Sequence, residues 1–337
     1  MKICLLGEYG SELDEGFKNV ASTVSSELSK KYDVLNVNVK EIFSTHFWKQ
    51  IRDFKPHIIH YLTAPTLSSF VALRIAKIYC NKDAKLVISS LHPYCLKLLR
   101  NPVLKTFIPL IKPDLILTQS HESEVIFKEI GCNTEFLPNG VDTERFVPAS
   151  AKIKEELREK YGIDKKKFVI LHVGHIKETR GIRIFNRLQD KTNQVIIVGS
   201  SYFRTDENLY QELINSGCII WNRYFENIEE VYALADCYVF PVMRDDSIFM
   251  PLSVMEAMSC NLPVISTKYE GLTKAFEEGD GLFFAKSEED FVNLLKKIKN
   301  DTNIKNREKV LPYSWEAVGK KLEEIYFKLI SGDRNED

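Results

Sequence analysis

The stretch that decides the fold is residues 241–271, which read PVMRDDSIFMPLSVMEAMSCNLPVISTKYEG. The apolar run 237–241 that leads into it is typical of a buried strand, and a loop follows the carboxyl end of that strand. We predict a helix over 252–259, with Pro251 at its first position, because proline is favoured there. A second apolar run, 263–266, predicts the next strand. Strand, loop, helix and strand in this order are the repeating unit of a parallel α/β sheet.

Glu256 is the single charged residue of the predicted helix. Its neighbours in that helix are apolar: Val254, Met255, Ala257 and Met258. An ionised side chain in such surroundings needs a polar partner, because burying an unpaired charge is costly. In one interpretation Glu256 binds a hydroxyl, an amide or a cation of a ligand. In the other it pairs with a nearby Arg or Lys for structural reasons.

The same alternation of strands and helices extends over most of the chain. In the first half, strands are predicted near 2–6, 33–39, 57–62, 85–90, 114–118 and 134–137, with helices such as 16–31, 68–81 and 121–130 between them. After a charged segment, strands are predicted near 168–173, 195–199, 218–221, 237–241, 263–266 and 281–284. We therefore predict two Rossmann-like, doubly wound α/β domains, residues 1–148 and 149–313.

Composition agrees with two globular domains. The chain has 337 residues, and its formal net charge of −1 argues against a nucleic-acid-binding protein. Its seven cysteines form no C-x-x-C pair, which is typical of reduced thiols in the cytosol. The chain begins directly with a predicted strand and has no apolar run of ~18 to 20 residues. We therefore expect a cytoplasmic protein without a signal peptide or a membrane span.

The stretch 241–271 resembles the donor-binding motif of the retaining glycosyltransferases of family 4, which are two-domain proteins of the GT-B type. Glu256-Ala257-Met258 and Leu262-Pro263-Val264-Ile265 match the second half of that motif. The segment 137–148 resembles another family motif, P-N-G-V-D-x-x-x-F-x-P, almost letter for letter. The predicted helix 314–331, which begins Ser-Trp-Glu, resembles the last helix of the family, which crosses back onto the first domain.

The first half of the donor motif departs from the family pattern. Ile248 stands where the family has its first Glu, and Pro251 stands in the family's Gly region. The loop is also a few residues longer than usual, so Asp245 or Asp246 is the candidate for the role of the first carboxylate. The resemblance implies that Glu256, the second carboxylate, holds the ribose hydroxyls of a nucleotide.

Residues 173–181, VGHIKETRG, resemble the family's V-G-R-L-x-x-x-K-G, in which the Arg and the Lys hold the diphosphate of the donor. Arg180 preserves the second cation. His175 replaces the first, and a mostly neutral imidazole supplies less charge than a guanidinium. Lys177 is a further candidate. The resemblance therefore implies that Arg180 offsets the negative charge that grows on the leaving diphosphate.

In the first domain, the candidate residues follow predicted strands or begin a helix. Gly16 resembles part of the family's Gly-Gly loop near the donor phosphate, and a plain turn is the alternative. His92 follows the strand 85–90 and resembles the family His that faces the donor sugar. His60 fits a core histidine equally well, and Ser120 fits either a family Ser or a helix cap.

The resemblance implies a metal-independent, retaining glycosyltransferase whose two domains face each other across a cleft. It would move a sugar from a nucleotide diphosphate sugar to a hydroxyl acceptor, with no metal site and no cofactor. The implied catalytic residues are His92 and Arg180. The implied donor-binding residues are Gly16, Asn139, His175, Lys177, Arg180, Asp245, Pro251, Leu252 and Glu256. Two other classes stay open: a non-catalytic sugar-nucleotide-binding or scaffold protein and, with less support, a nucleotide-sugar epimerase.

Residues 96–112 mix basic and apolar side chains and contain no Asp or Glu. Such a composition is typical of a segment that lies on a membrane surface. A core helix with one solvated face is the alternative. The first interpretation predicts peripheral contact with the inner face of the membrane and a lipid-linked acceptor.

Overall fold

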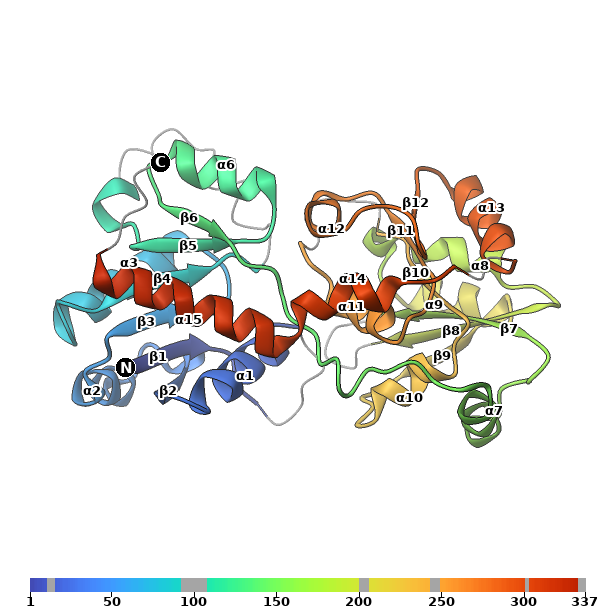
Figure 1. Cartoon of the computed structure of the whole chain (residues 1–337), viewed down its shortest axis with the longest axis horizontal. Coiled ribbons are helices and arrows are strands. Elements are labelled where there is room, and N and C mark those ends of the chain that lie inside the picture. Colours follow the sequence, from blue (N-terminus) through green and yellow to red (C-terminus); the bar gives the residue numbers. More distant parts are fainter. Residues whose placement is uncertain (11–15, 92–107, 200–205, 243–248, 301–302, 333–337) are drawn as a thin grey trace. The chain divides into compact units, whose positions relative to one another are not determined.

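The computed structural model describes residues 1–10, 16–91, 108–199, 206–242, 249–300 and 303–332 (Figure 1). The chain divides into two compact units. Unit 1 comprises residues 1–140, 248–250 and 315–337, and unit 2 comprises residues 141–247 and 251–314. Within these described residues, each unit contains a six-stranded sheet.

The sheet of unit 1 has the strand order β2-β1-β3-β4-β5-β6, and its strands pair in parallel. The strands are β1 Lys2–Gly7, β2 Asp33–Asn38, β3 Ile58–Tyr61, β4 Lys85–Ser89, β5 Leu115–Thr118 and β6 Thr134–Phe136. The helices of unit 1 include α1 Gly16–Ser29, α2 Thr45–Phe54, α3 Leu67–Tyr79, α6 His121–Glu129 and α15 Trp315–Ser331. Parallel strands need long crossovers, and helices of this kind supply them while covering both faces of the sheet.

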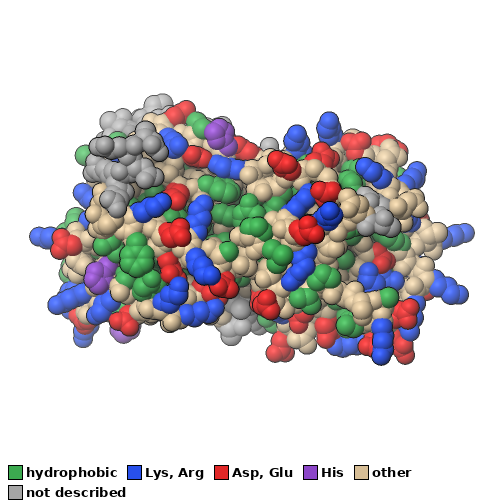
Figure 2. Space-filling model, in the orientation of Figure 1, with side chains coloured by type: hydrophobic (Ala, Val, Ile, Leu, Met, Phe, Trp, Pro, Cys, Tyr) green, Lys and Arg blue, Asp and Glu red, His purple; other side chains and the backbone are tan. Residues whose placement is uncertain are grey.

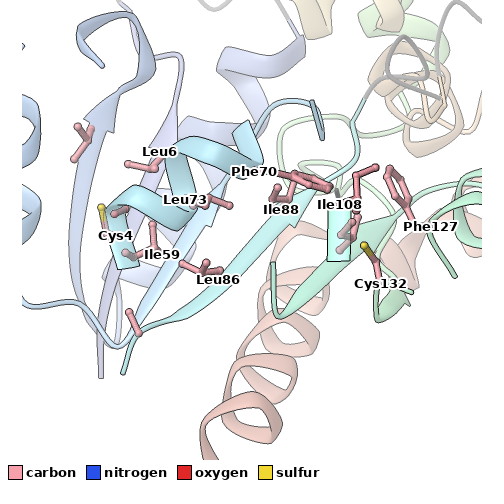
Figure 3. Packing of buried hydrophobic residues seen from close by; sticks show 14 of the residues in the cluster. Cys4, Leu6, Ile59, Phe70, Leu73, Leu86, Ile88, Ile108, Phe127 and Cys132 are labelled. Carbon is pink, nitrogen blue, oxygen red and sulfur yellow. The ribbon is translucent and has the colours of Figure 1, made fainter. Parts of the chain in front are cut away.

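Side chains alternate between the two faces of the unit 1 sheet, as they do along any strand. Cys4 and Leu6 of β1 and Ile59 of β3 belong to the core that α2, α3 and α6 cover. Figure 3 shows Phe70 and Leu73 of α3 among these strand side chains. The helices α1 and α15 pack against each other, and α15 returns the end of the chain to unit 1.

His60 of β3 connects the sheet of unit 1 to α15. The ring is fully buried, with Nδ1 2.6 Å from the hydroxyl of Tyr326 in α15 and Nε2 2.8 Å from Oγ of Ser89 in β4. Burial lowers the pKa of His60 to about 3, so the ring is neutral near pH 7. His60 is therefore a core histidine whose two nitrogens are both hydrogen-bonded, which was one of the alternatives that the sequence left open.

The sheet of unit 2 has the strand order β12-β11-β10-β7-β8-β9, again with parallel pairs. The strands are β7 Phe168–Val173, β8 Asn193–Gly199, β9 Ile219–Asn222, β10 Cys237–Phe240, β11 Val264–Thr267 and β12 Leu282–Ala285. The helices of unit 2 include α7 Ala151–Lys160, α8 Phe185–Leu188, α9 Glu207–Asn215, α10 Ile228–Ala233, α11 Leu252–Ser259, α12 Glu270–Ala275, α13 Glu288–Ile298 and α14 Asn306–Val310. One face of this sheet forms a hydrophobic core with α8, α9 and α13.

The strand order of unit 2 reverses next to β7. The chain runs outward from β7 to β8 and β9, and then returns to place β10 on the other side of β7. The carboxyl ends of β7 and β10 are therefore neighbours at a topological switch point. In open parallel sheets, ligands bind beyond the carboxyl ends of the strands at such a point, so this edge of the sheet is the candidate ligand site.

The predicted fold class is confirmed for both sheets, since every strand expected from the sequence overlaps an observed one. The helix predicted over 252–259 is α11. Pro251 differs from the prediction: it is the cap residue before α11 rather than the first helical residue, because its ψ of 123° is extended.

Charged side chains of both signs are interspersed on the face that Figure 2 shows, in agreement with the balanced composition. The six cysteines in the described part of the chain are free thiols, and five of them are buried. Among the described residues, no helix combines the length and the hydrophobicity needed to cross a bilayer.

Candidate functional site

Tyr238 connects three elements at the carboxyl edge of the unit 2 sheet. It lies in β10, and its hydroxyl donates to the carbonyl oxygen of Val173, the last residue of β7, at 3.2 Å. The same hydroxyl is hydrogen-bonded to the side chain of Ser253, in the first turn of α11. The Tyr238 hydroxyl therefore links the end of β7, where the loop to Arg180 begins, to the first turn of α11.

Glu256 of α11 is half-buried and has the polar partner that its apolar surroundings require. Tyr232 of α10 donates its hydroxyl proton to Oε2 of Glu256 at 2.6 Å. This partner is a neutral hydroxyl, not the Arg or Lys of the structural interpretation. An ionised carboxylate offers about four lone-pair sites, so the bond from Tyr232 leaves acceptor capacity for a ligand.

Electrostatics make Glu256 an unusual carboxyl group. Burial raises its pKa to about 6, while the hydrogen bond from Tyr232 and the charge of Arg145 lower it. The guanidinium of Arg145 is held by Glu229 at 2.7 Å. Near pH 7 Glu256 is therefore mostly ionised, and at mildly acidic pH it takes up a proton.

Aromatic contacts hold Tyr232 in place. Its ring meets that of Phe146 edge-on, with centroids 5.4 Å apart, and stacks on Tyr238 at 5.9 Å. The carbonyl oxygen of Phe146 accepts a hydrogen bond of 2.6 Å from Ser259 at the end of α11. Phe146 belongs to the P-N-G-V-D-x-x-x-F-x-P motif. It packs on Tyr232, the partner of Glu256, and is hydrogen-bonded to α11, the helix that carries Glu256.

His172 of β7 is a second buried polar group at this edge. Its Nδ1 lies 2.9 Å from the carbonyl oxygen of Val239, which can only accept, so Nδ1 carries the proton. Nε2 has no hydrogen-bond partner in the described part of the chain. It lies 2.9 Å from the position that a Cβ on Gly174 would occupy, so Gly174 allows the backbone to pass close to the ring. Burial lowers the pKa of His172 to about 4.

Arg180 ends the short 3-10 helix Glu178–Arg180 in the loop after β7, and it is half-buried. Its charge contributes to lowering the pKa of His172 and opposes the burial that raises the pKa of Tyr238. Glu256 also acts on the pKa of Tyr238, in the raising direction. The structure thus brings Arg180 and Glu256 within electrostatic range of the same tyrosine.

The other predicted residues of unit 2 that the structure describes lie in the loop after β7 or at the start of α11. His175 and Lys177 are half-buried in the loop between β7 and Arg180. Pro251 and Leu252 stand at the beginning of α11, where Pro251 supplies no side-chain cap. The amide groups in the first turn of a helix have no partner within the helix, and such amides bind anions.

Two residues that were predicted to bind the donor lie in unit 1. Asn139 is buried: its Oδ1 accepts from Gln119 at 2.7 Å, and its Nδ2 donates to the carbonyl oxygen of Met250 at 2.8 Å. Both ends of this amide therefore hold neighbouring protein groups. Gly16 begins α1, and a Cβ at this position would meet no atom within 4 Å.

His92, Asp245 and Asp246 lie outside the described residues, and so does most of the predicted membrane segment 96–112. In the described end of that segment, Ile108 is buried in the core of unit 1 and Leu110 is exposed.

Three polar residues that shape this edge were not among the predicted site residues: Tyr232, Tyr238 and His172. Tyr238 and His172 are polar side chains inside runs that predict buried strands, and this mismatch is a signal that could have found them. Tyr232 gave no such signal, because it lies 24 residues before Glu256 in a different helix.

Comparison with known proteins identifies the part of the chain that carries this edge. Residues 153–314, nearly all of them in unit 2, match the family described as Glycosyl transferases group 1. The chain contains a group 1 glycosyltransferase domain.

Relatives in sequence are glycosyltransferases as well. An uncharacterized glycosyltransferase of Methanocaldococcus jannaschii is 31% identical over 169 residues, which are 46% of this chain and 39% of that protein. The UDP-Gal:alpha-D-GlcNAc-diphosphoundecaprenol alpha-1,3-galactosyltransferase of Escherichia coli is 26% identical over 288 residues, 75% of this chain and 69% of that protein. The chain spans about two fifths of the length of the first curated relatives it matches.

Solved structures of the same fold include Anabaena Alr3699/HepE in complex with UDP and glucose. The TM-score is 0.75 at 17% sequence identity, and the match covers 97% of this chain and 100% of that chain. The chain therefore has the GT-B glycosyltransferase fold that the sequence predicted.

Proposed function

We propose that the chain is a retaining, metal-independent glycosyltransferase of family 4, which moves a sugar from a nucleotide diphosphate sugar to a hydroxyl acceptor. The observation that carries this proposal is the presence of Glu256 and Arg180 at one edge of the unit 2 sheet, at its switch point. A nucleotide diphosphate sugar has groups that match both, since ribose hydroxyls donate to a carboxylate and phosphates accept from a guanidinium.

The proposed donor site consists of the loop after β7 and the helix α11 that follows β10. The carboxylate of Glu256 accepts hydrogen bonds from the ribose hydroxyls. Arg180, with His175 and Lys177 before it, binds the diphosphate, and the amides at the start of α11 add donors. The complex of Anabaena HepE with UDP and glucose supports a uridine nucleotide as the first donor to examine.

In the proposed reaction, the bond between the anomeric carbon and the diphosphate oxygen breaks, and its electron pair stays on that oxygen. The acceptor oxygen bonds to the anomeric carbon on the same face, which retains the configuration. The leaving phosphate oxygen takes the proton of the acceptor hydroxyl. Arg180 stabilises the charge that grows on the diphosphate, and His92 orients the sugar.

The acceptor is proposed to be a hydroxyl of a lipid-linked sugar. The E. coli relative supports this proposal, because its name describes transfer from UDP-Gal to a diphosphoundecaprenol-linked sugar.

A ligand panel tests the proposed function. Melting curves are recorded with UDP, GDP, ADP and their sugar nucleotides, since a ligand at ~100 times its dissociation constant adds roughly 2.7 kcal/mol of stability. We expect one nucleotide series to stabilise the protein. Release of the nucleotide diphosphate is then measured with and without acceptor sugars. Binding without release, with every acceptor, would instead favour the non-catalytic sugar-nucleotide-binding protein.

A further inference from the structure

Helix α3 is apolar on two opposite sides. Its inner side is buried in the core of unit 1, where Figure 3 shows Phe70 and Leu73 beside strand residues such as Ile59 and Ile88. Its outer side carries five large apolar side chains that are 41% to 65% exposed: Leu67, Val71, Ile75, Ile78 and Tyr79. A helix that is apolar all round is normally covered on every side.

These five residues form one continuous stripe, which we call the outer face of α3. Their spacing of four, four, three and one residues keeps them on one side of a helix with 3.6 residues per turn. Arg74 is exposed and lies within the same stripe. Single exposed apolar residues are ordinary, but a stripe of five on one helix is typical of a surface that binds another protein, a membrane or a ligand.

The charges around the outer face of α3 indicate which of these it binds. Residues 63–82 contain no Asp or Glu, while they include Arg74, Lys77 and Lys82. Lys77 is paired with Asp114. The other two cations are exposed at the stripe and at the end of the helix.

A groove of about 360 Å³ continues the outer face of α3 beyond the end of the helix. Its lining residues are Lys55, Ile78, Tyr79, Cys80, Asn81 and Lys82. Apolar side chains thus stand beside two exposed ammonium groups, an arrangement that suits an anionic group on an apolar body. Of the nearby acids, Asp53 is paired with Arg52, and Asp83 follows Lys82 in the chain.

We propose that the outer face of α3 docks the protein on an anionic lipid surface. The apolar stripe enters the boundary between headgroups and acyl chains, and Arg74, Lys82 and Lys55 contact lipid phosphates. This inference goes beyond the proposed transfer reaction and does not depend on it. A second copy of the chain fits less well, because a two-fold interface opposes a surface to itself and would bring these cations together.

Vesicle flotation tests the apolar part of the proposal. The protein is mixed with vesicles of phosphatidylcholine alone, or of phosphatidylcholine with phosphatidylglycerol. We expect binding to the mixed vesicles, and we expect the double variant Ile75→Glu/Ile78→Glu to bind at least about tenfold more weakly. The matched control Ile153→Glu/Ile214→Glu changes two isoleucines of unit 2 with similar exposure, 48% and 41%, and should bind like the wild type.

A second variant tests the charges. Arg74→Glu/Lys82→Glu should weaken binding to the mixed vesicles by about fivefold or more for each cation, and added salt should weaken binding of the wild type. All changed residues are exposed, and circular dichroism melting verifies that each variant folds.

Three outcomes would overturn the proposal. The first is no binding of the wild type to mixed vesicles, or equal binding to both vesicle types. The second is equal binding by the Ile75/Ile78 variant and the unit 2 control. The third is a wild-type dimer, seen by light scattering without vesicles, that the Ile75/Ile78 variant converts to a monomer, because the outer face of α3 would then bind a second copy.

Discussion

Each sheet buries one histidine in a strand beside its switch point, and the two histidines differ in their partners. His60 of unit 1 is hydrogen-bonded through both nitrogens, to Tyr326 of α15 and to Ser89 of the next strand. His172 of unit 2 is hydrogen-bonded through Nδ1 alone, and its Nε2 faces the backbone at Gly174. Both rings are neutral, since burial lowers their pKa values to about 3 and about 4.

The difference follows from what covers each histidine. In unit 1, the hydroxyl of Tyr326 in α15 is hydrogen-bonded to the ring of His60, and this bond stabilises the packing of α15 on the sheet. In unit 2, the loop after β7 passes the ring closely and continues to Arg180, while Glu256 stands in the helix after β10. We infer that unit 1 uses its polar group at this position for the fold, whereas unit 2 leaves polar groups at its edge for a ligand.

The largest expected effect is on transfer, at the unit 2 edge. Arg180→Ala should lower the rate by ~10² to 10³, because one group that stabilises developing charge is lost. Lys177→Ala is the comparison variant and should lower the rate less, since Lys177 lies in the same loop but does not align with the family's diphosphate cation. Initial rates of nucleotide release with the preferred donor measure both variants. Equal rates for the two would remove Arg180 from the proposed role.

The next largest effect is on the free energy of unfolding, which should fall more when His60 is replaced than when His172 is replaced. His60→Phe leaves the hydroxyls of Tyr326 and Ser89 without their partner, and each unsatisfied buried group costs about 1–3 kcal/mol, so unfolding should become easier by at least about 2 kcal/mol. His172→Phe removes one hydrogen bond, to Val239, and should cost about 1 kcal/mol. Urea unfolding of both variants gives the two values. A larger loss at His172 would contradict the comparison.

The smallest effect is a dependence of stability on pH. A histidine whose folded pKa lies below its unfolded value of 6.5 stabilises the fold fully above pH 6.5, and this contribution declines as the pH falls toward the folded pKa. Each ring should therefore cost about 1.4 kcal/mol per pH unit between roughly pH 6 and pH 4. Below about pH 4 only His60 should continue to contribute.

Urea unfolding at pH 6 and pH 5 measures this slope. Between these two pH values, each histidine should lower the free energy of unfolding of the wild type by about 1.2 kcal/mol. Either histidine-to-phenylalanine variant should therefore show a change that is smaller by this amount. Using differences between proteins cancels the opposite contribution of Glu256, whose pKa is raised to about 6 and whose protonation favours the folded state as the pH falls. An unchanged slope in the His60→Phe variant would mean that this ring is not neutral in the fold.

Local sequence predicted the elements well because their signals are local. The apolar runs of strands such as 168–173 and the apolar helix 252–259 can be recognised without knowledge of distant residues. Partners across the fold have no such signal. His60 and Tyr326 are 266 residues apart, and Glu256 and Tyr232 meet only once α10 packs on α11. The assignment of residues 248–250 to unit 1, between two parts of unit 2, depends in the same way on tertiary contacts.

The central claim is that the carboxylate of Glu256 binds the donor nucleotide on unit 2. Glu256→Gln tests it most directly, because the amide oxygen of Gln can still accept the hydrogen bond from Tyr232 while the charge is lost. Calorimetric titration of the preferred nucleotide into wild type and variant is run beside melting curves without ligand. We predict that binding weakens by ~1.5 to 3 kcal/mol, with little change in unliganded melting. Unchanged affinity together with a large drop in unliganded stability would contradict the account and make Glu256 a residue of the core.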